Sequence, residues 1–197
     1  MKKFALLASA AVAVTLANPA SAAVIIVKAF DHSSNSGSGT GLNTGIGLTF
    51  GQTLTITSST NDLWSAGALP RYSDATGLIG NRFATAADDS GQLVGTQIGK
   101  NWGILTIGGF SAPYGALVGK INGVYQYLGA NFSGPAWQTG NLTLFYWDSY
   151  TPDNFGEIAF NVNTIPESAT WLMMLAGFGA VGFALRRRRQ HMRVSFA

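Results

Sequence analysis

The chain has 197 residues and no cysteine, which excludes disulfides, thiolate metal sites and cysteine nucleophiles. Its formal net charge is +3, but seven of the 12 basic residues lie at the two ends. The span from Ala23 to Ile165 holds five basic and eight acidic residues, a net charge of −3. We therefore expect no nucleic-acid partner.

The N-terminus has the order of a secretory signal peptide. Lys2 and Lys3 precede an uncharged, largely apolar run over residues 4–16. The small residues Ala20 and Ala22 then flank Ser21, which fits the pockets of signal peptidase. We predict a signal peptide over residues 1–22, with an uncleaved N-terminal anchor as the alternative.

Residues 23–164 are expected to form one all-β domain. Leu54 and Ile56 alternate with threonines, a two-residue period typical of a strand with one buried face. Similar patterns predict strands at residues 24–29, 102–107, 116–121, 142–147 and 157–162, and a Ser/Gly/Asn-rich loop at 31–43. Many short strands joined by glycine-rich turns predict a β-sandwich.

The aromatic residues of this domain are expected mainly to pack. Tyr146 and Trp147 fall on opposite faces of one predicted strand, so we expect one of them in the core. Trp64, Trp102 and Trp137 are expected in the core or at sheet edges rather than as ligand platforms.

Three segments of the domain resemble a known lectin family. They are Gly51-Gln52-Thr53-Leu54-Thr55-Ile56-Thr57, the stretch Ala112 to Ile121 containing Gly115-Ala116-Leu117-Val118, and Leu142 to Asp148 running into Asp153-Asn154-Phe155-Gly156. In this order they resemble the PA-I galactophilic lectin family. The resemblance implies a jelly-roll, galactose-binding-like β-sandwich in which one Ca²⁺ bridges protein and sugar.

Residues 148–154 are the candidate calcium loop. They place two carboxylates and an amide within seven residues, and such oxygens are the ligands that Ca²⁺ takes. The alternative is a polar hairpin loop whose Asp and Asn side chains cap turns. The resemblance implies Asp148, Asp153 and Asn154 as side-chain ligands, and backbone carbonyl ligands from Thr151 and Tyr72.

Sugar binding would use the same loop. Open positions on a bound Ca²⁺ can take two hydroxyls, while an aromatic ring packs on the C–H face of the sugar. The residues expected to meet carbohydrate are Asp148, Tyr150, Asp153 and Asn154, with Tyr72 as a further aromatic neighbour.

The C-terminal segment has the order of a membrane anchor. Ala169 to Leu185 is an uncharged run of 17 residues, about 26 Å long as a helix and enough to cross a thin bilayer. Arginines at 186–189 would stop transfer and remain cytoplasmic. We predict a sorting segment at 165–190, containing a transmembrane helix, and a cytoplasmic tail at 191–197.

The same segment resembles the PEP-CTERM sorting signal in its Pro-Glu-Pro, Trp-containing form. The residues that carry the resemblance are Pro166, Glu167, Trp171, Gly177, Gly179, Gly182, Arg186, Arg187, Arg188 and Arg189; Ser168 stands where the family has its second proline. The resemblance implies processing by an exosortase. A plain single-pass anchor is the alternative.

Together these features predict an exported cell-surface or extracellular-matrix protein, without enzymatic activity, that binds carbohydrate through Ca²⁺ in an exopolysaccharide or biofilm. The alternatives are a structural envelope or biofilm protein without a ligand site, and a glycan hydrolase. A hydrolase could use Asp88, Asp89, Asp148, Asp153 and Glu157. A serine hydrolase is not expected, because there is no GxSxG motif and His32 is the only histidine before the tail.

Overall fold

The computed structural model describes residues 21–165, 174–183 and 186. Residues 21–165 belong to one compact unit, which is the predicted all-β domain. The described residues of the C-terminal tail belong to a second unit.

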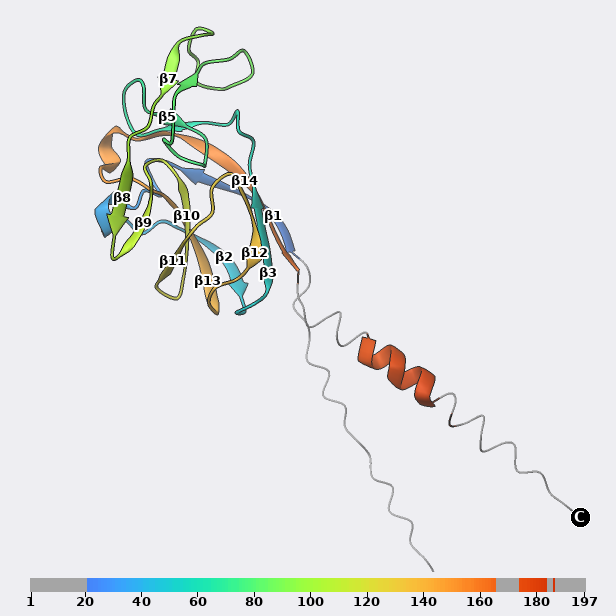
Figure 1. Cartoon of the computed structure of the whole chain (residues 1–197). Helices are drawn as coiled ribbons and strands as arrows, with labels where there is room; N and C mark the ends of the chain where they lie inside the picture. The colour runs from blue at the N-terminus through green and yellow to red at the C-terminus, as the bar shows by residue number, and fades with distance from the viewer. Residues whose placement is uncertain (1–20, 166–173, 184–185, 187–197) are drawn as a thin grey trace, which may run out of the picture. The chain divides into compact units, whose positions relative to one another are not determined.

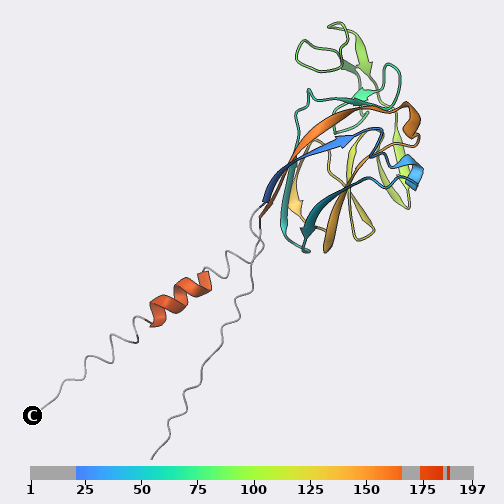
Figure 2. The ribbon, with the colours of Figure 1, turned by 180° about the vertical axis from the view of Figure 1, so that it is seen from behind.

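Two antiparallel sheets make up the domain (Figure 1). In the six-stranded sheet β14 is central, because its residues 161–164 pair with β1 on one side and with β3 on the other. Its strands are β1 (Ser21–Lys28), β3 (Thr53–Thr57), β4 (Trp64–Ser65), β5 (Tyr72–Ser73), β12 (Asn131–Pro135) and β14 (Phe155–Ile165). Figure 2 shows β1 and β14 side by side from behind.

The second sheet has four strands, in the order β11-β10-β13-β2. They are β2 (Leu42–Leu48), β10 (Leu117–Ile121), β11 (Val124–Tyr127) and β13 (Gly140–Tyr146). Two small hairpins and two short 3-10 helices complete the domain: β6 (Arg82–Phe83) with β7 (Gln97–Gly99), β8 (Ile104–Ile107) with β9 (Phe110–Pro113), η1 (Asn35–Gly37) and η2 (Thr151–Asp153).

The two sheets pack face to face around one apolar core, so the expected β-sandwich is confirmed. Strand alternation produces this core: in β14 every second residue from Ile158 to Thr164 is buried. Trp64 of the first sheet meets Tyr146 of the second edge-on, with 4.7 Å between ring centroids. The Trp64 Nε1–H also donates a hydrogen bond to the Gly115 carbonyl at 2.8 Å.

A second apolar cluster lies on the outer face of the four-stranded sheet. The β8–β9 hairpin covers this face, so that Trp147 is fully buried. Its Nε1–H donates to the Leu105 carbonyl at 3.0 Å, and its ring meets Phe110 at 5.5 Å. The expectation of one core residue in this pair is met by Tyr146, and Trp147 is buried as well because the hairpin gives this sheet apolar partners on both faces.

The expected strands are confirmed with shifted ends. The strand expected at 102–107 begins only at Ile104, and the sequence patterns missed β2, β4, β5, β6, β7, β9, β11 and β12. The sheet begins at Ser21 and ends at Ile165. Ser21 and Ala22 of the predicted cleavage site are therefore part of β1 and pair with β14. The finer jelly-roll and galactose-binding-like assignments stay predictions.

In the C-terminal unit, residues 174–183 form a helix whose side chains are exposed. Within the described part of the chain, no helix reaches the length and apolar character required to span a bilayer. Residues 1–20 of the predicted signal peptide (1–22) lie outside the described residues, and so does the predicted cytoplasmic tail at 191–197. The sorting residues Pro166, Glu167 and Trp171, the arginines at 187–189 and parts of the predicted 169–185 span lie outside them as well.

Candidate functional site

The predicted calcium loop is a single connection between β13 and β14. Asp148 follows β13, η2 covers Thr151–Asp153, and Asn154 precedes β14. Asp148 and Asn154 are each only 4% exposed, whereas Thr151 and Asp153 are half-buried. Tyr150 points outward and is 60% exposed.

The segment around η1 holds this loop in place. The Ser34 hydroxyl donates to the Asp148 carbonyl at 2.8 Å and accepts from the Asp148 N–H at 2.9 Å. The Ser36 hydroxyl donates to the Ser149 carbonyl at 3.1 Å, and the Thr151 N–H donates to Asn35 Oδ1 at 3.4 Å. These contacts were not predicted, because residues 31–43 showed only the composition of a loop.

The Asp148 carboxylate is enclosed. Its Oδ2 accepts a hydrogen bond from the Tyr150 N–H at 2.8 Å. Burial raises the pKa of Asp148, while hydrogen bonds from the Tyr150 and Ser149 N–H groups and the Asn154 side chain oppose the rise. The negative charge of Asp153 raises the pKa further. A cation placed here would relieve this unfavourable burial of charge.

Asn154 contributes an oxygen that has no partner. Its N–H donates to the Thr151 carbonyl at 3.0 Å, and its Nδ2 donates to the Ala29 carbonyl at 3.4 Å. Its Oδ1 is buried and accepts no hydrogen bond within the described residues. The hydroxyl of Tyr146 is likewise buried without a partner there. A buried acceptor without a donor costs about 1–3 kcal/mol, so this part of the loop suits a bound ligand.

Asp153 is already paired with a cation of the chain. Its Oδ2 lies 3.2 Å from Arg71 Nη1, which also donates to the Ala66 carbonyl at 3.1 Å. A Cβ at Gly67 would come within 2.7 Å of the same carboxylate oxygen, so only glycine leaves room for this ion pair. Arg71 was not among the predicted site residues.

The side chain of Tyr72 lies beside the end of the loop, where its ring contacts Phe155. The ring meets Phe155 edge-on at 5.2 Å between centroids, and the hydroxyl is hydrogen-bonded to Gln92. Its backbone carbonyl lies against Gly99 of β7, where a Cβ would come within 2.5 Å of the oxygen. The structure therefore brings Asp148, Thr151, Asp153 and Asn154 into one loop and places the Tyr72 carbonyl next to β7.

These residues fit a hard cation with a mixed oxygen set. Asp148 would offer a buried carboxylate and Asn154 an unpartnered amide oxygen, and Ca²⁺ takes such ligands. The described residues contain no cluster of three or more His, Cys, Asp and Glu side chains. Backbone carbonyls and ligand hydroxyls would therefore have to supply the rest of the six to eight oxygens that Ca²⁺ takes.

Two of the carboxylates named for a hydrolase, Asp88 and Asp89, accept hydrogen bonds from nearby backbone N–H groups. Burial raises the pKa of Asp88, but hydrogen bonds from Ser90 and Thr85 outweigh it and lower the pKa to about 2. Burial, a hydrogen bond with Asp62 and the Asp62 charge raise the pKa of Asp89. Asp89 Oδ1 accepts from the Leu63 N–H at 2.9 Å, and Asp62 Oδ2 accepts from the Ala159 N–H at 2.9 Å.

His32 lies in the turn after β1. Its Nδ1 accepts a hydrogen bond from the Lys28 N–H at 2.9 Å, and burial lowers its pKa. Nδ1 is therefore occupied in holding the turn, and the expected loop role of this residue is confirmed.

Residues 164–189 match the PEP-CTERM protein-sorting motif. This match confirms the sorting resemblance and indicates an exported protein that is processed by an exosortase.

No curated protein matches the chain. Among solved structures, the chain is similar to the EclA N-terminal domain, described as a PllA-like lectin, with 21% identity and a TM-score of 0.45. The match covers 72% of this chain and 95% of that domain, and a likeness of this size does not assign a function.

Proposed function

We propose that this PEP-CTERM protein is exported, sorted to the cell surface or matrix, and binds carbohydrate there through a Ca²⁺ ion held by the loop at residues 148–154. The observation that supports a ligand in this loop is the buried Asn154 Oδ1, which has no hydrogen-bond partner within the described residues and belongs to a side chain hydrogen-bonded to Asp148. The proposal includes a membrane role for residues 169–185, which rests on their sequence alone, and an exopolysaccharide or biofilm setting.

Different residues of the loop would bind the ion and contact the sugar. Asp148, fixed by Ser34, and Asn154 would hold the ion from inside, while Thr151 and Asp153 would face it from the exposed side. A bound Ca²⁺ supplies coordination positions that sugar hydroxyls can fill. Tyr150, 60% exposed, would offer its ring to the apolar face of the sugar.

A melting experiment on the purified full-length chain in detergent tests the calcium step. Ca²⁺ should raise the melting temperature and EDTA should reverse the rise, because an ion that binds only the folded state stabilises it. Asp148→Asn should remove the rise. Asp31→Asn is the matched control, since Asp31 is exposed and, among the described residues, forms an ion pair with Lys28 alone, at 3.7 Å. An unchanged melting temperature in the wild-type chain would refute the calcium step.

A structural protein without a ligand site is the second candidate. It is favoured by the Arg71–Asp153 ion pair, which neutralises one of the two loop carboxylates without any metal. This candidate predicts that neither Ca²⁺ nor glycans change the melting temperature. A glycan array probed with and without EDTA then decides between the two, because calcium-dependent binding to any glycan contradicts the structural candidate.

A further inference from the structure

Two cations converge on Trp102 beside the calcium loop. Arg71 Cζ lies 4.4 Å and Lys100 Nζ 4.7 Å from the ring centroid. Trp102 is 36% exposed. The electron-rich face of an indole attracts cations at such distances, so both charged groups lie against the same ring at the surface.

The backbone fixes the position of Trp102. Its N–H donates to the Leu78 carbonyl at 3.1 Å, and the next residue, Gly103, accepts from the Tyr114 N–H at 3.4 Å. Leu78 lines a pocket of ≈ 400 Å³ formed by residues 72–74 and 76–82. The cation pair therefore stands on a fixed part of the surface: Arg71 contacts the loop at Asp153, and Trp102 is hydrogen-bonded to the pocket residue Leu78.

The charges of this cluster are not balanced. Arg71 pairs with Asp153 through Nη1, at 3.2 Å. Within the described residues, Lys100 forms no ion pair. The cluster thus has a cation in excess, at the surface of a domain whose net charge is −3. An ammonium held in place without a counter-charge suits a single anionic group of a ligand, whereas the negative domain disfavours a dense polyanion such as a nucleic acid.

We propose that Arg71 and Lys100, held by Trp102, form a subsite for the carboxylate of an acidic sugar, so that the domain prefers uronate-containing glycans to neutral ones. This inference rests on the carbohydrate binding proposed above. A guanidinium and an ammonium that reach a carboxylate give charge-assisted hydrogen bonds, which are stronger than those to a neutral hydroxyl. A neutral sugar would leave Lys100 without such a partner.

A matched pair of ligands tests the preference directly. The full-length chain in detergent is titrated with a short galacturonate oligomer and with its fully methyl-esterified form, which has the same backbone without the charge. Short oligomers avoid the gelling of long polyuronates with Ca²⁺. The acid should bind roughly tenfold more tightly than the ester, the change expected when one charge-assisted contact is removed.

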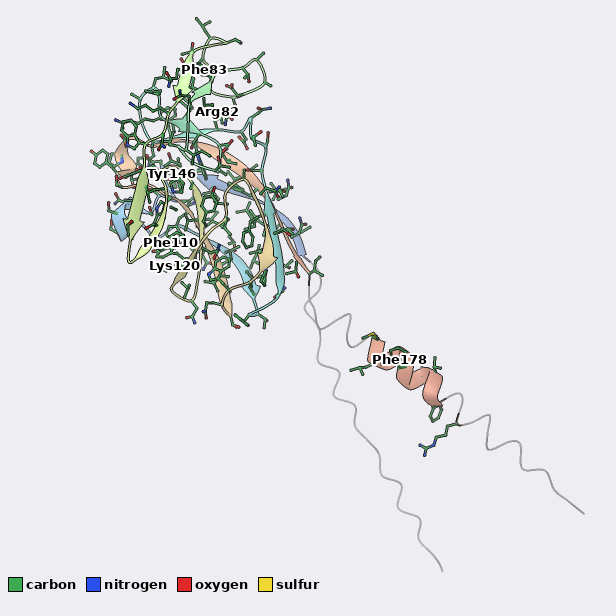
Figure 3. All side chains as sticks on the ribbon, in the orientation of Figure 1. Arg82, Phe83, Phe110, Lys120, Tyr146 and Phe178 are labelled. Atoms are coloured by element: carbon green, nitrogen blue, oxygen red, sulfur yellow. The ribbon has the colours of Figure 1, made fainter. Side chains whose placement is uncertain are left out.

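Lys100→Gln should weaken binding of the acid roughly tenfold and leave binding of the ester unchanged. Lys120→Gln is the matched control, because Lys120 also lies over an aromatic ring, that of Tyr125 at 4.8 Å. Figure 3 shows Lys120 well away from the hairpin that carries Arg82, one of the pocket residues. Melting temperatures of both variants check that each is folded.

Equal binding of acid and ester, binding of neither, or an unchanged preference in Lys100→Gln would each overturn the inference. The calcium step is judged separately by the melting experiment. A preference for the acid that depends on Lys100 but persists in EDTA would leave this inference standing and refute only the calcium dependence of sugar binding. A calcium-dependent rise in melting temperature with equal binding of acid and ester would do the reverse.

Discussion

The Ser34 hydroxyl is joined to Asp148 by two hydrogen bonds, one to its carbonyl at 2.8 Å and one from its N–H at 2.9 Å. The two residues are 114 positions apart in the chain, and both are buried. A loop that presents a buried carboxylate needs its backbone fixed, because movement of the backbone would open the carboxylate to water. The contact therefore links the segment around η1 directly to the candidate site.

Replacing Ser34 with Ala should destabilise the domain and loosen the loop. The Asp148 N–H would remain buried without its acceptor, which costs about 1–3 kcal/mol. Urea unfolding measures this loss, and Ser133→Ala on the exposed edge strand β12 should change stability by less than about 0.5 kcal/mol. A stability equal to that of the wild type would show that Ser34 does not hold the loop.

Two neighbouring carboxylates should give opposite dependences of stability on pH. The pKa of Asp89 is raised above its ordinary value of 3.8, so the folded state binds its proton more tightly than the unfolded state. Its contribution is therefore fully present below pH 3.8 and is lost as pH rises through the raised pKa. The pKa of Asp88 is lowered to about 2, so its contribution is present above pH 3.8 and is lost as pH falls toward 2.

Urea unfolding as a function of pH checks this pair. Asp89→Asn should keep the acceptor for the Leu63 N–H, remove the repulsion from Asp62, and raise stability at neutral pH. Asp88→Asn should lower stability at neutral pH, because the carboxylate that accepts from Thr85 and Ser90 is lost. If both variants shift stability in the same direction at neutral pH, the opposite pKa shifts of Asp88 and Asp89 are wrong.

Removing the hydroxyl of Tyr146 should not cost stability. The hydroxyl is buried without a partner within the described residues, while the ring packs against Trp64. Tyr146→Phe keeps the ring and removes the unsatisfied group, so we expect an unchanged or higher free energy of unfolding, by up to about 1 kcal/mol. Trp64→Phe, which loses the Gly115 hydrogen bond, should instead be destabilising. A clear loss of stability in Tyr146→Phe would reveal a partner for the hydroxyl.

Local sequence patterns predicted several strands of the sheets. They did not predict the contacts between residues far apart in the chain. The alternation at Leu54 and Ile56, or from Ile158 to Val162, records which face of a strand is buried, and it can be identified without knowing the partner strand. The burial of Trp147 depends on a hairpin some 40 residues earlier in the chain, at residues 104–113. No pattern within one strand contains that information.

In the candidate site, too, the residues close together in sequence could be predicted, and the distant one could not. Asp148, Asp153 and Asn154 could be named because all three lie within seven residues. Arg71 could not, because it reaches Asp153 across 82 positions and depends on the absence of a side chain at Gly67. The partners of the loop are set by the register of the folded sheets, which the sequence of the loop does not contain.

The β8–β9 hairpin should detach from the sheet when its aromatic anchor is removed. Phe110 packs on Trp147 at 5.5 Å and on Tyr125 at 5.7 Å, and Figure 3 shows it close to Lys120 beneath the hairpin. Phe110→Ala should cost about 2–4 kcal/mol and expose the turn at Gly108 and Gly109 to protease. Phe83→Ala is the control, because Phe83 is 53% exposed in β6. Equal protease resistance of both variants would contradict the covering role of the hairpin.

Export of the domain can be tested at a loop that the structure places on the surface. Leu93 and Val94, between β6 and β7, are 84% and 71% exposed, and such loops tolerate insertions. An epitope inserted there should be cleaved by protease added to intact spheroplasts. In cells without exosortase, a second epitope after Ala197 should stay protected if, as predicted from the sequence, the arginines at 186–189 keep the tail cytoplasmic. Protection of the loop epitope would contradict export, and with it every proposal made for the domain outside the cell.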